Sequence, residues 1–360
     1  MTNALNTSQQ NASCDCEASP PPKCGNREPS ILTTHHKQFH PEWVKRTVLL
    51  PGWFEAFPRA ADSYWRSLLW SWRLFRESRH FDAVVTGAEH VGQMFALMQS
   101  LFRTKSRRRV HVMIDFPWAV CPGRLTLLFK RIQMWIAIRS IDQIFAHASP
   151  EEEVRFSEAL GVSREKFRFV PFHYCLNAPE PTVSEGDYIF SGGDTSRDYQ
   201  TLIRAVACMP YRTVICTRQT SYFRGVDIPA NVEVATVKPG RFDELMAGAR
   251  VLVVPLPERE IHTGGHTVIV NAMKLGKAII VLGRAEYKSY LEHGKTGLLL
   301  TPGDSESLRV AIDRVFAEPE FGRFLARNAH EAAAAFSPEI FFERVFEAIE
   351  AAFQAKQSRH

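Results

Sequence analysis

The sequence lacks several features that would place it in a common class of protein. Its 360 residues contain no charge-free apolar run close to the roughly 18 residues of a membrane-spanning helix, which argues against a transmembrane protein. Seven cysteines are a sparse, odd set for so long a chain, so we expect reduced thiols and no disulfide framework. No basic segment followed by an apolar core begins the chain, so the sequence predicts no secretory signal and a cytoplasmic location.

Sequence signals for a metal site are also scarce. Cys14, Cys16 and Cys24 lie in the polar, Pro-containing residues 1–40, without a fourth ligand at the spacing of zinc sites. We therefore interpret residues 1–40 as a disordered tail with loose thiols. No Asp-x-Asp pair follows a predicted strand, so we expect neither a metal nor a cofactor.

From residue 46 onward, short apolar runs alternate with longer stretches of helical periodicity. Several runs are apolar almost throughout, as is typical of parallel strands that are covered by helices on both faces. Repeated strand–helix units predict doubly wound α/β domains. The predicted strands are residues 46–50, 82–86, 110–116, 143–148, 167–172, 187–193, 212–217, 232–237, 251–256, 278–282 and 297–301.

Residues 177–186, which begin with Asn177 and contain Pro179 and Pro181, interrupt this pattern and are interpreted as a linker. It separates two halves of similar construction, residues 41–176 and 187–338, and a helix over 339–360 ends the chain. Two facing domains of this kind bring the carboxyl ends of both sheets to one cleft, where open α/β sheets bind ligands.

Two glycine turns in the second half point to an anionic ligand. Gly192 and Gly193 follow a predicted strand, and Arg197 precedes a helix that we expect to begin near Asp198. The second turn, Gly264 to Thr267, precedes another predicted helix. Glycines admit a ligand close to the backbone, helix starts offer free N–H groups, and Arg suits phosphate. Ordinary structural turns explain either segment equally well when it is taken alone.

Taken together with Gly294–Leu299 and Pro302–Asp304, these segments resemble the C-terminal donor domain of GT-B glycosyltransferases, especially the family 4 group (glycosyl transferases group 1). That group has a glycine loop leading into Glu-Ala-Met, and the matching residues here are Asn271–Met273. The resemblance covers about residues 187–315. It implies a GT-B fold, in which two Rossmann-like domains with parallel sheets face each other, residues 41–176 on the acceptor side and 187–338 on the donor side.

The resemblance also implies a function. A nucleotide-diphosphate sugar would lie in the cleft, with its diphosphate near Gly193, Arg197 and the turn made by Gly264, Gly265, His266 and Thr267. The sugar would point towards the first domain and pass to a saccharide or lipid-linked acceptor, as in polysaccharide biosynthesis.

The sequence departs from the family at both of its glutamates, which align with Thr263 and Asn271. The Asn271 amide oxygen can still accept hydrogen bonds from ribose hydroxyls, and His262 or His266 can substitute near the sugar. In the first domain the family's His aligns with Ile114, while the following Asp115 remains.

Asp115 and His90 are therefore the catalytic candidates, with Glu89 as a further polar group. These departures leave open a non-catalytic sugar-nucleotide-binding or scaffold protein on the same fold, and a GT-B epimerase as a third alternative.

Positive charge is concentrated in residues 101–140, which carry a net +8 while the whole chain carries +5. Within them, residues 124–139 show apolar side chains at helical spacing beside Arg124, Lys130 and Arg131. Such a basic amphipathic helix can lie on an anionic membrane, which would make the protein peripheral on the inner face of the membrane. It can equally cover the first sheet with its Arg stems turned outward. No nucleic-acid-binding motif is present, so we expect no nucleic-acid partner.

Overall fold

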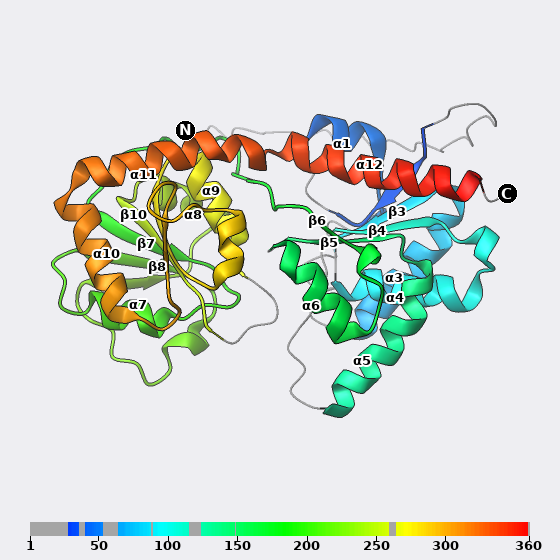
Figure 1. The fold of residues 1–360 in the computed structure, drawn as a ribbon, viewed down its shortest axis with the longest axis horizontal. Helices are drawn as coiled ribbons and strands as arrows, with labels where there is room; N and C mark the ends of the chain where they lie inside the picture. Colours follow the sequence, from blue (N-terminus) through cyan, green and yellow to red (C-terminus); the bar gives the residue numbers. More distant parts are fainter. Residues whose placement is uncertain are drawn as a thin grey trace, which may run out of the picture.

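The chain folds into two α/β lobes, which a computed structural model shows side by side (Figure 1). The structure describes residues 28–35, 40–52, 64–87, 89–114, 124–147, 149–258 and 264–358. Each lobe is built on a six-stranded sheet in which all strand pairs are parallel. This is the α/β architecture that the alternation of strands and helices predicts.

The first sheet has helices on both faces. On one face lie α1 (Pro41–Arg46) and α12 (Pro338–Gln357), packed against alternate side chains of the sheet. On the other face lie α3 (Tyr64–Glu77), α4 (Glu89–Phe102), α5 (Arg124–Ala137) and α6 (Pro150–Leu160). The strands, in sheet order, are β2 (Thr47–Leu49), β1 (Ile31–Thr33), β3 (Ala83–Thr86), β4 (Val110–Met113), β5 (Gln143–Ala146) and β6 (Phe167–Phe169).

The interpretation of residues 1–40 as a disordered tail is wrong for β1. Ile31–Thr33 is fully buried and pairs with both β2 and β3, so it belongs to the interior of the sheet. Within the strand, the side chains of Ile31 and Leu32 pack into the cores on opposite faces of the sheet. Three residues in polar surroundings are too short a run to show a strand period, so only tertiary pairing defines this strand.

The second sheet is likewise covered on both faces. Helices α8 (Pro239–Ala247) and α9 (His266–Lys274) pack on one face, and α7 (Tyr199–Val206) and α10 (Ser305–Ala317) on the other. Helix α11 (Pro319–Ala332) contributes to both cores. The strands, in sheet order, are β12 (Leu298–Leu300), β11 (Ala278–Leu282), β10 (Val251–Pro255), β7 (Tyr188–Gly192), β8 (Arg212–Cys216) and β9 (Val232–Ala235).

The helix starts follow from capping side chains. The Asp198 carboxylate accepts a hydrogen bond from the Thr201 N–H at 3.1 Å, and α7 begins one residue after Asp198. The Asp304 carboxylate accepts from the Ser307 N–H at 2.9 Å at the start of α10. The predicted helix start near Asp198 is therefore confirmed, and α7 begins at the carboxyl edge of its sheet.

The lobes are joined at two places. After β6 the chain crosses to the second lobe, and after α11 it returns to the first lobe, along which α12 lies (Figure 1). The buried Tyr290 hydroxyl accepts a hydrogen bond from the Phe172 N–H at 2.8 Å and donates to the His147 carbonyl. Arg155 of α6 forms an ion pair with Glu286 of the second lobe. These three contacts hold the second lobe, through Tyr290 and Glu286, against the first lobe.

Candidate donor-binding site

Two glycine turns meet at the carboxyl edge of the second sheet. Gly193, with φ +127°, follows β7, and Gly265, with φ +88°, precedes α9. Both backbones lie in the left-handed region that favours glycine. A Cβ built on Gly193 would lie 2.3 Å from Arg197 Nη2, and one built on Gly264 would lie 3.3 Å from Arg197 Nη1. Arg197 therefore lies between the two turns, which the sequence places about 70 residues apart.

The Arg197 side chain is 6% exposed and bonds to the backbone around it. Nε donates to the Gly192 carbonyl at 3.1 Å, and Nη1 donates to the Thr195 and Ser196 carbonyls at 2.6 and 3.1 Å. This arrangement shapes the first turn and places a positive charge behind both glycine loops. The role of Arg197 as a phosphate-binding cation stays a prediction, to which the structure adds a role in holding the turns.

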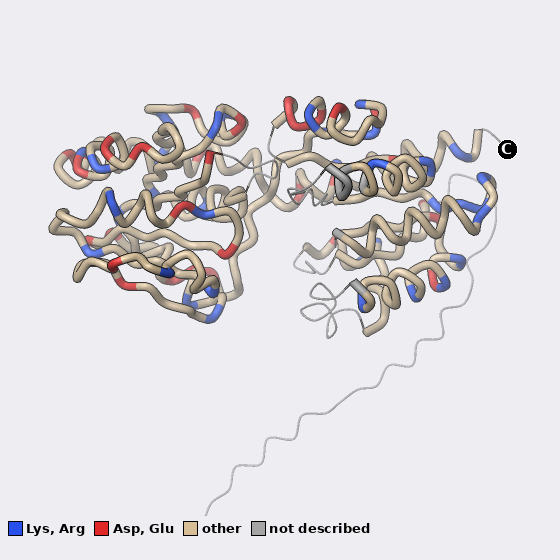
Figure 2. Tube along the Cα trace, turned by 90° about the horizontal axis from the view of Figure 1, so that it is seen from below, with Lys and Arg blue, Asp and Glu red and all other residues tan. Residues whose placement is uncertain are grey.

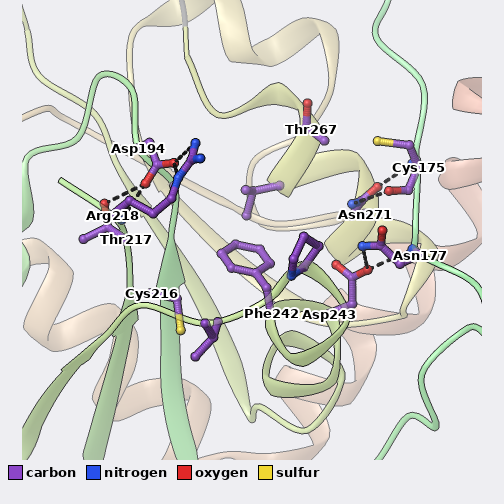
Figure 3. Close-up of a pocket in the computed structure, with 14 residues that line it drawn as sticks. Cys175, Asn177, Asp194, Cys216, Thr217, Arg218, Phe242, Asp243, Thr267 and Asn271 are labelled. Atoms are coloured by element: carbon purple, nitrogen blue, oxygen red, sulfur yellow. Dashed lines mark hydrogen bonds and ion pairs between the residues drawn. The ribbon is translucent and has the colours of Figure 1, made fainter. Parts of the chain in front are cut away.

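A pocket of about 400 Å³ opens beside these turns (Figure 3). Gly193, Asp194 and the residues that end β8 line one side, α8 and the start of α9 line another, and the linker closes it. Thr267 and Asn271, both predicted as donor-binding residues, are among the lining residues. The pocket thus joins segments from β7, β8, α8, α9 and the linker at one sheet edge, the place where α/β sheets bind ligands.

Two charged residues that the sequence analysis did not single out lie at this pocket. The Asp194 carboxylate accepts hydrogen bonds from the Arg218 N–H at 2.7 Å, from Arg218 Nε at 2.6 Å and from the Thr217 hydroxyl at 3.0 Å. Partial burial would raise the pKa of Asp194, but these hydrogen bonds and the Arg218 charge together lower it. The Arg218 side chain is 78% exposed, so it offers a cation at the pocket mouth. Its position directly after a predicted strand is the signal that could have identified it.

The floor of the pocket combines an aromatic ring with a buried acid. Phe242 and Asp243 are neighbours on α8 (Figure 3). A Cβ on Gly192 would lie 2.5 Å from the Phe242 ring, so the strand end needs glycine to admit this ring. Asp243 is 4% exposed, and its carboxylate accepts from the Asn177 N–H and side-chain amide at 2.9 and 2.6 Å. Sequence reasoning missed both residues because α8 has no glycine turn before it.

The Asn271 side chain is bound to the backbone of the segment that precedes the linker. Its Oδ1 accepts from the Cys175 N–H at 2.7 Å, and its Nδ2 donates to the Cys175 carbonyl at 3.3 Å. The side chain is 5% exposed, so these bonds are shielded from water. The predicted role of Asn271 in binding ribose is therefore combined with a structural one, since its amide oxygen already accepts one hydrogen bond.

His266, the first residue of α9, packs among aromatic rings. Its ring lies 5.2 Å from that of Tyr287 in a stacked arrangement and 4.9 Å from that of Tyr290. The Tyr287 hydroxyl donates to the Gly264 carbonyl at 2.6 Å, so the same cluster fixes the second glycine turn. The contact of His266 with the donor stays a prediction, whereas the structure shows its ring packed against Tyr287 and Tyr290.

The remaining predicted residues lie in or near the first lobe and the loop before α9. His90 is exposed in the first turn of α4, after β3, and therefore at the carboxyl edge of the first sheet. Asp115, Thr263 and His262 lie outside the described residues. Within the described ranges, no group of three His, Cys, Asp or Glu side chains could hold a metal ion. No helix in those ranges is long and apolar enough to cross a membrane.

Comparison with solved structures identifies the class of fold. The sucrose-phosphate synthase of Thermosynechococcus elongatus superposes with a TM-score of 0.63 at 17% identity, covering 86% of this chain and 84% of that one. Anabaena HepE in complex with UDP-glucose gives 0.69 at 16% identity, covering 90% and 100%. TarM of S. aureus gives 0.60 at 12% identity, covering 79% and 58%. The protein has the GT-B fold, as its sequence motifs predict.

Comparison with protein families identifies the group within that class. Residues 210–318 match the family model described as glycosyl transferases group 1. No curated protein sequence matches the chain at a significant level. The second lobe thus matches glycosyl transferases group 1 over residues 210–318, in agreement with the resemblance that its glycine turns and Gly-Lys-Thr-Gly-Leu-Leu segment indicate.

Proposed function

We propose that the protein transfers a sugar from a nucleotide-diphosphate sugar, and that the nucleotide binds in the pocket of the second lobe. The observation that carries this proposal is the meeting of two glycine turns around the buried Arg197 guanidinium, beside a pocket of about 400 Å³. Backbone N–H groups at two helix starts and a nearby cation suit a diphosphate. The Phe242 ring supplies an apolar surface for a base or ribose.

We propose UDP as the nucleotide of the donor. Anabaena HepE, which shares the fold over 90% of this chain, has been solved in complexes with UDP-glucose, with UDP and glucose, and with UDP. These complexes support a uridine donor because the same fold holds that nucleotide there. The sugar itself is left to experiment.

The first lobe would supply the acceptor side. In this proposal residues 41–176 bind a saccharide or lipid-linked acceptor, and residues 187–338 bind the donor. His90 and Asp115, which follow β3 and β4, would act as the polar groups near the transferred sugar. Transfer by such an enzyme depends mainly on positioning the sugar and on stabilising the leaving diphosphate. Residues 124–139 are proposed to face an anionic membrane at its inner surface.

Binding and turnover can be tested separately. Isothermal titration calorimetry with UDP, ADP and GDP should show binding of UDP, and a panel of UDP-sugars should show release of UDP with an acceptor extract. The variant Gly193→Val should abolish binding, because its side chain would press on Arg197 at a backbone of φ +127°. Gly240→Ala is the matched control, since a Cβ there meets nothing within 4 Å. Equal UDP binding by both variants would contradict this placement of the nucleotide.

The alternative is a protein that binds sugar nucleotides without turning them over. The observation that favours it is Asn271, which stands where the family has Glu and whose amide is bonded to the Cys175 backbone. Tight binding of UDP with no turnover of any donor in the panel, in the presence of candidate acceptors, would support this alternative over transfer.

A further inference from the structure

The first lobe exposes an apolar surface formed by three neighbouring helices. Helix α3 packs against α4, and α4 packs against α5, so the three form one layer below the first sheet (Figure 1). Sixteen large hydrophobic side chains are exposed in the described part of the chain, and nine of them belong to these helices. We call this the three-helix surface; it consists of Trp65, Leu69, Trp72, Leu101, Phe102, Leu128, Phe129, Ile132 and Trp135.

Helix α3 presents its large apolar residues to solvent. Trp65 and Leu69 are 73% and 70% exposed, and Trp72 is 48% exposed, with a spacing of four and three residues that places them on one side of the helix. The buried side carries Leu74 together with Ser67 and Ser71. Ser71 donates to the carbonyls of Ser67 and Val91 at 2.6 and 3.2 Å. Covering the sheet does not require tryptophans on the outer side, so this pattern calls for an external partner.

Helix α5 has apolar residues on two sides. Met134 and Ala137 are buried in the core, as expected for a helix that covers a sheet. Leu128, Ile132 and Trp135 form a second row at helical spacing, each more than half exposed. Ring contacts link the exposed residues of α3 and α4, since the Phe75 ring of α3 lies 5.8 Å from that of Trp72 and 6.3 Å from that of Phe102 of α4.

Positive charge accompanies this surface. Helix α5 contains three basic residues and no acidic residue, and Lys105 and Arg107 are exposed directly after α4. The Arg139 guanidinium lies 4.0 Å from the Trp135 ring centre. Figure 2 shows Lys and Arg along the outer parts of this lobe. Tryptophan and aliphatic side chains beside Arg and Lys match the interface of an anionic bilayer, where rings enter the headgroup region and cations meet phosphates.

We infer that the three-helix surface binds an anionic lipid bilayer, and that residues of α3 and α4 take part in the contact as well as those of α5. In parallel β–α units each helix starts at the carboxyl edge of the preceding strand, so the first turns of α4 and α5 lie on the cleft side of this lobe. The three-helix surface runs from Trp65 near that edge to Phe102 and the basic Lys105 and Arg107 at the opposite end, so docking lays the lobe along the bilayer with the carboxyl edge of its sheet at one end of the contact. If the proposed transferase function holds, the acceptor is then lipid-linked and reaches the cleft from the membrane.

Vesicle sedimentation with the full chain tests this inference. Vesicles of phosphatidylcholine and phosphatidylglycerol in a 7:3 ratio should bind the protein about tenfold or more tightly than vesicles of phosphatidylcholine alone. The variant Leu69→Gln/Ile132→Gln/Trp135→Gln should lose about tenfold or more in partitioning, and Lys105→Glu/Arg107→Glu should lose binding to the anionic vesicles. The matched control is Val310→Gln/Phe324→Gln, which changes exposed apolar residues of the second lobe and should bind as the parent does.

Three results would overturn the inference: no preference for anionic vesicles, equal loss in the control variant, or a dimer in light scattering that the triple variant abolishes while vesicles remain unbound. UDP titration of each variant keeps the two proposals apart. Vesicle binding without UDP binding would refute the donor site alone, and UDP binding without vesicle binding would refute the membrane surface alone.

Discussion

Replacing Arg197 is the sharpest perturbation of the donor site. Arg197→Ala removes three hydrogen bonds to the carbonyls of Gly192, Thr195 and Ser196, together with a buried positive charge. A hydrogen bond to a charged group contributes about 1.5–3 kcal/mol, and the three share one guanidinium, so we expect the turn to lose about 3–5 kcal/mol in total. If the free energy of UDP binding is weakened by about 2 kcal/mol of this loss, the Kd for UDP rises about 30-fold.

The assay is calorimetric titration with UDP at fixed salt, with thermal unfolding as a check that the variants are folded. Arg197→Lys keeps the charge but cannot reproduce the planar fork, so its Kd should lie between those of the parent and the Ala variant. Arg218→Ala compares an exposed cation of the same pocket, whose charge is screened by water, so its loss should change the Kd less than about fivefold. If Arg197→Ala bound UDP within about twofold of the parent, the reasoning from Arg197 to the diphosphate would be refuted.

Three further predictions concern stability. Tyr290→Phe should lower the free energy of unfolding by about 1–3 kcal/mol in chemical denaturation, since a buried N–H and a buried carbonyl in the first lobe lose their partner. Burial and, secondarily, the Lys356 charge lower the pKa of His111 from its ordinary 6.5 to about 3. Between these two pKa values the unfolded chain binds a proton at His111 and the folded chain does not, so the free energy of unfolding falls by about 1.4 kcal/mol per pH unit as pH drops below 6.5. The variant His111→Gln lacks this proton uptake and should show a shallower decline in melting temperature between pH 6.5 and 4.5. Asn271→Ala should lower the melting temperature because it leaves the backbone of Cys175 unpaired, whereas an unchanged temperature with weaker UDP binding would assign Asn271 to the ligand alone.

Much of the fold could be predicted because strands that are buried on both faces must be apolar. Val251–Pro255 and Ala278–Leu282 are buried throughout, and their sequences alone identify them. In the second sheet, predicted strands ran past the observed ends at the carboxyl edge, as at Thr217, because residues there line the pocket. The strand Ile31–Thr33 escaped prediction because three residues show no period.

The site was predictable only where local chemistry marks it. Gly193 and Gly265 adopt positive φ, which favours glycine, so the two turns can be recognised in the sequence. Asp243 is brought to the pocket by the packing of α8 and by its bonds to Asn177 of the linker. Contacts of that kind depend on the arrangement of segments that are distant in the sequence, so no local sequence pattern predicts them.

The return of α12 to the first lobe has a mechanical consequence. The two segments that cross between the lobes are joined to each other, since the Tyr174 N–H donates to the Phe336 carbonyl at 3.0 Å and the His173 and Phe341 rings lie 4.6 Å apart. A body attached through two adjacent crossings can swing about the line that joins them but resists twisting about the long axis. A change in the spacing of the two lobes must therefore bend both crossing segments together, since the bonds between these segments couple them.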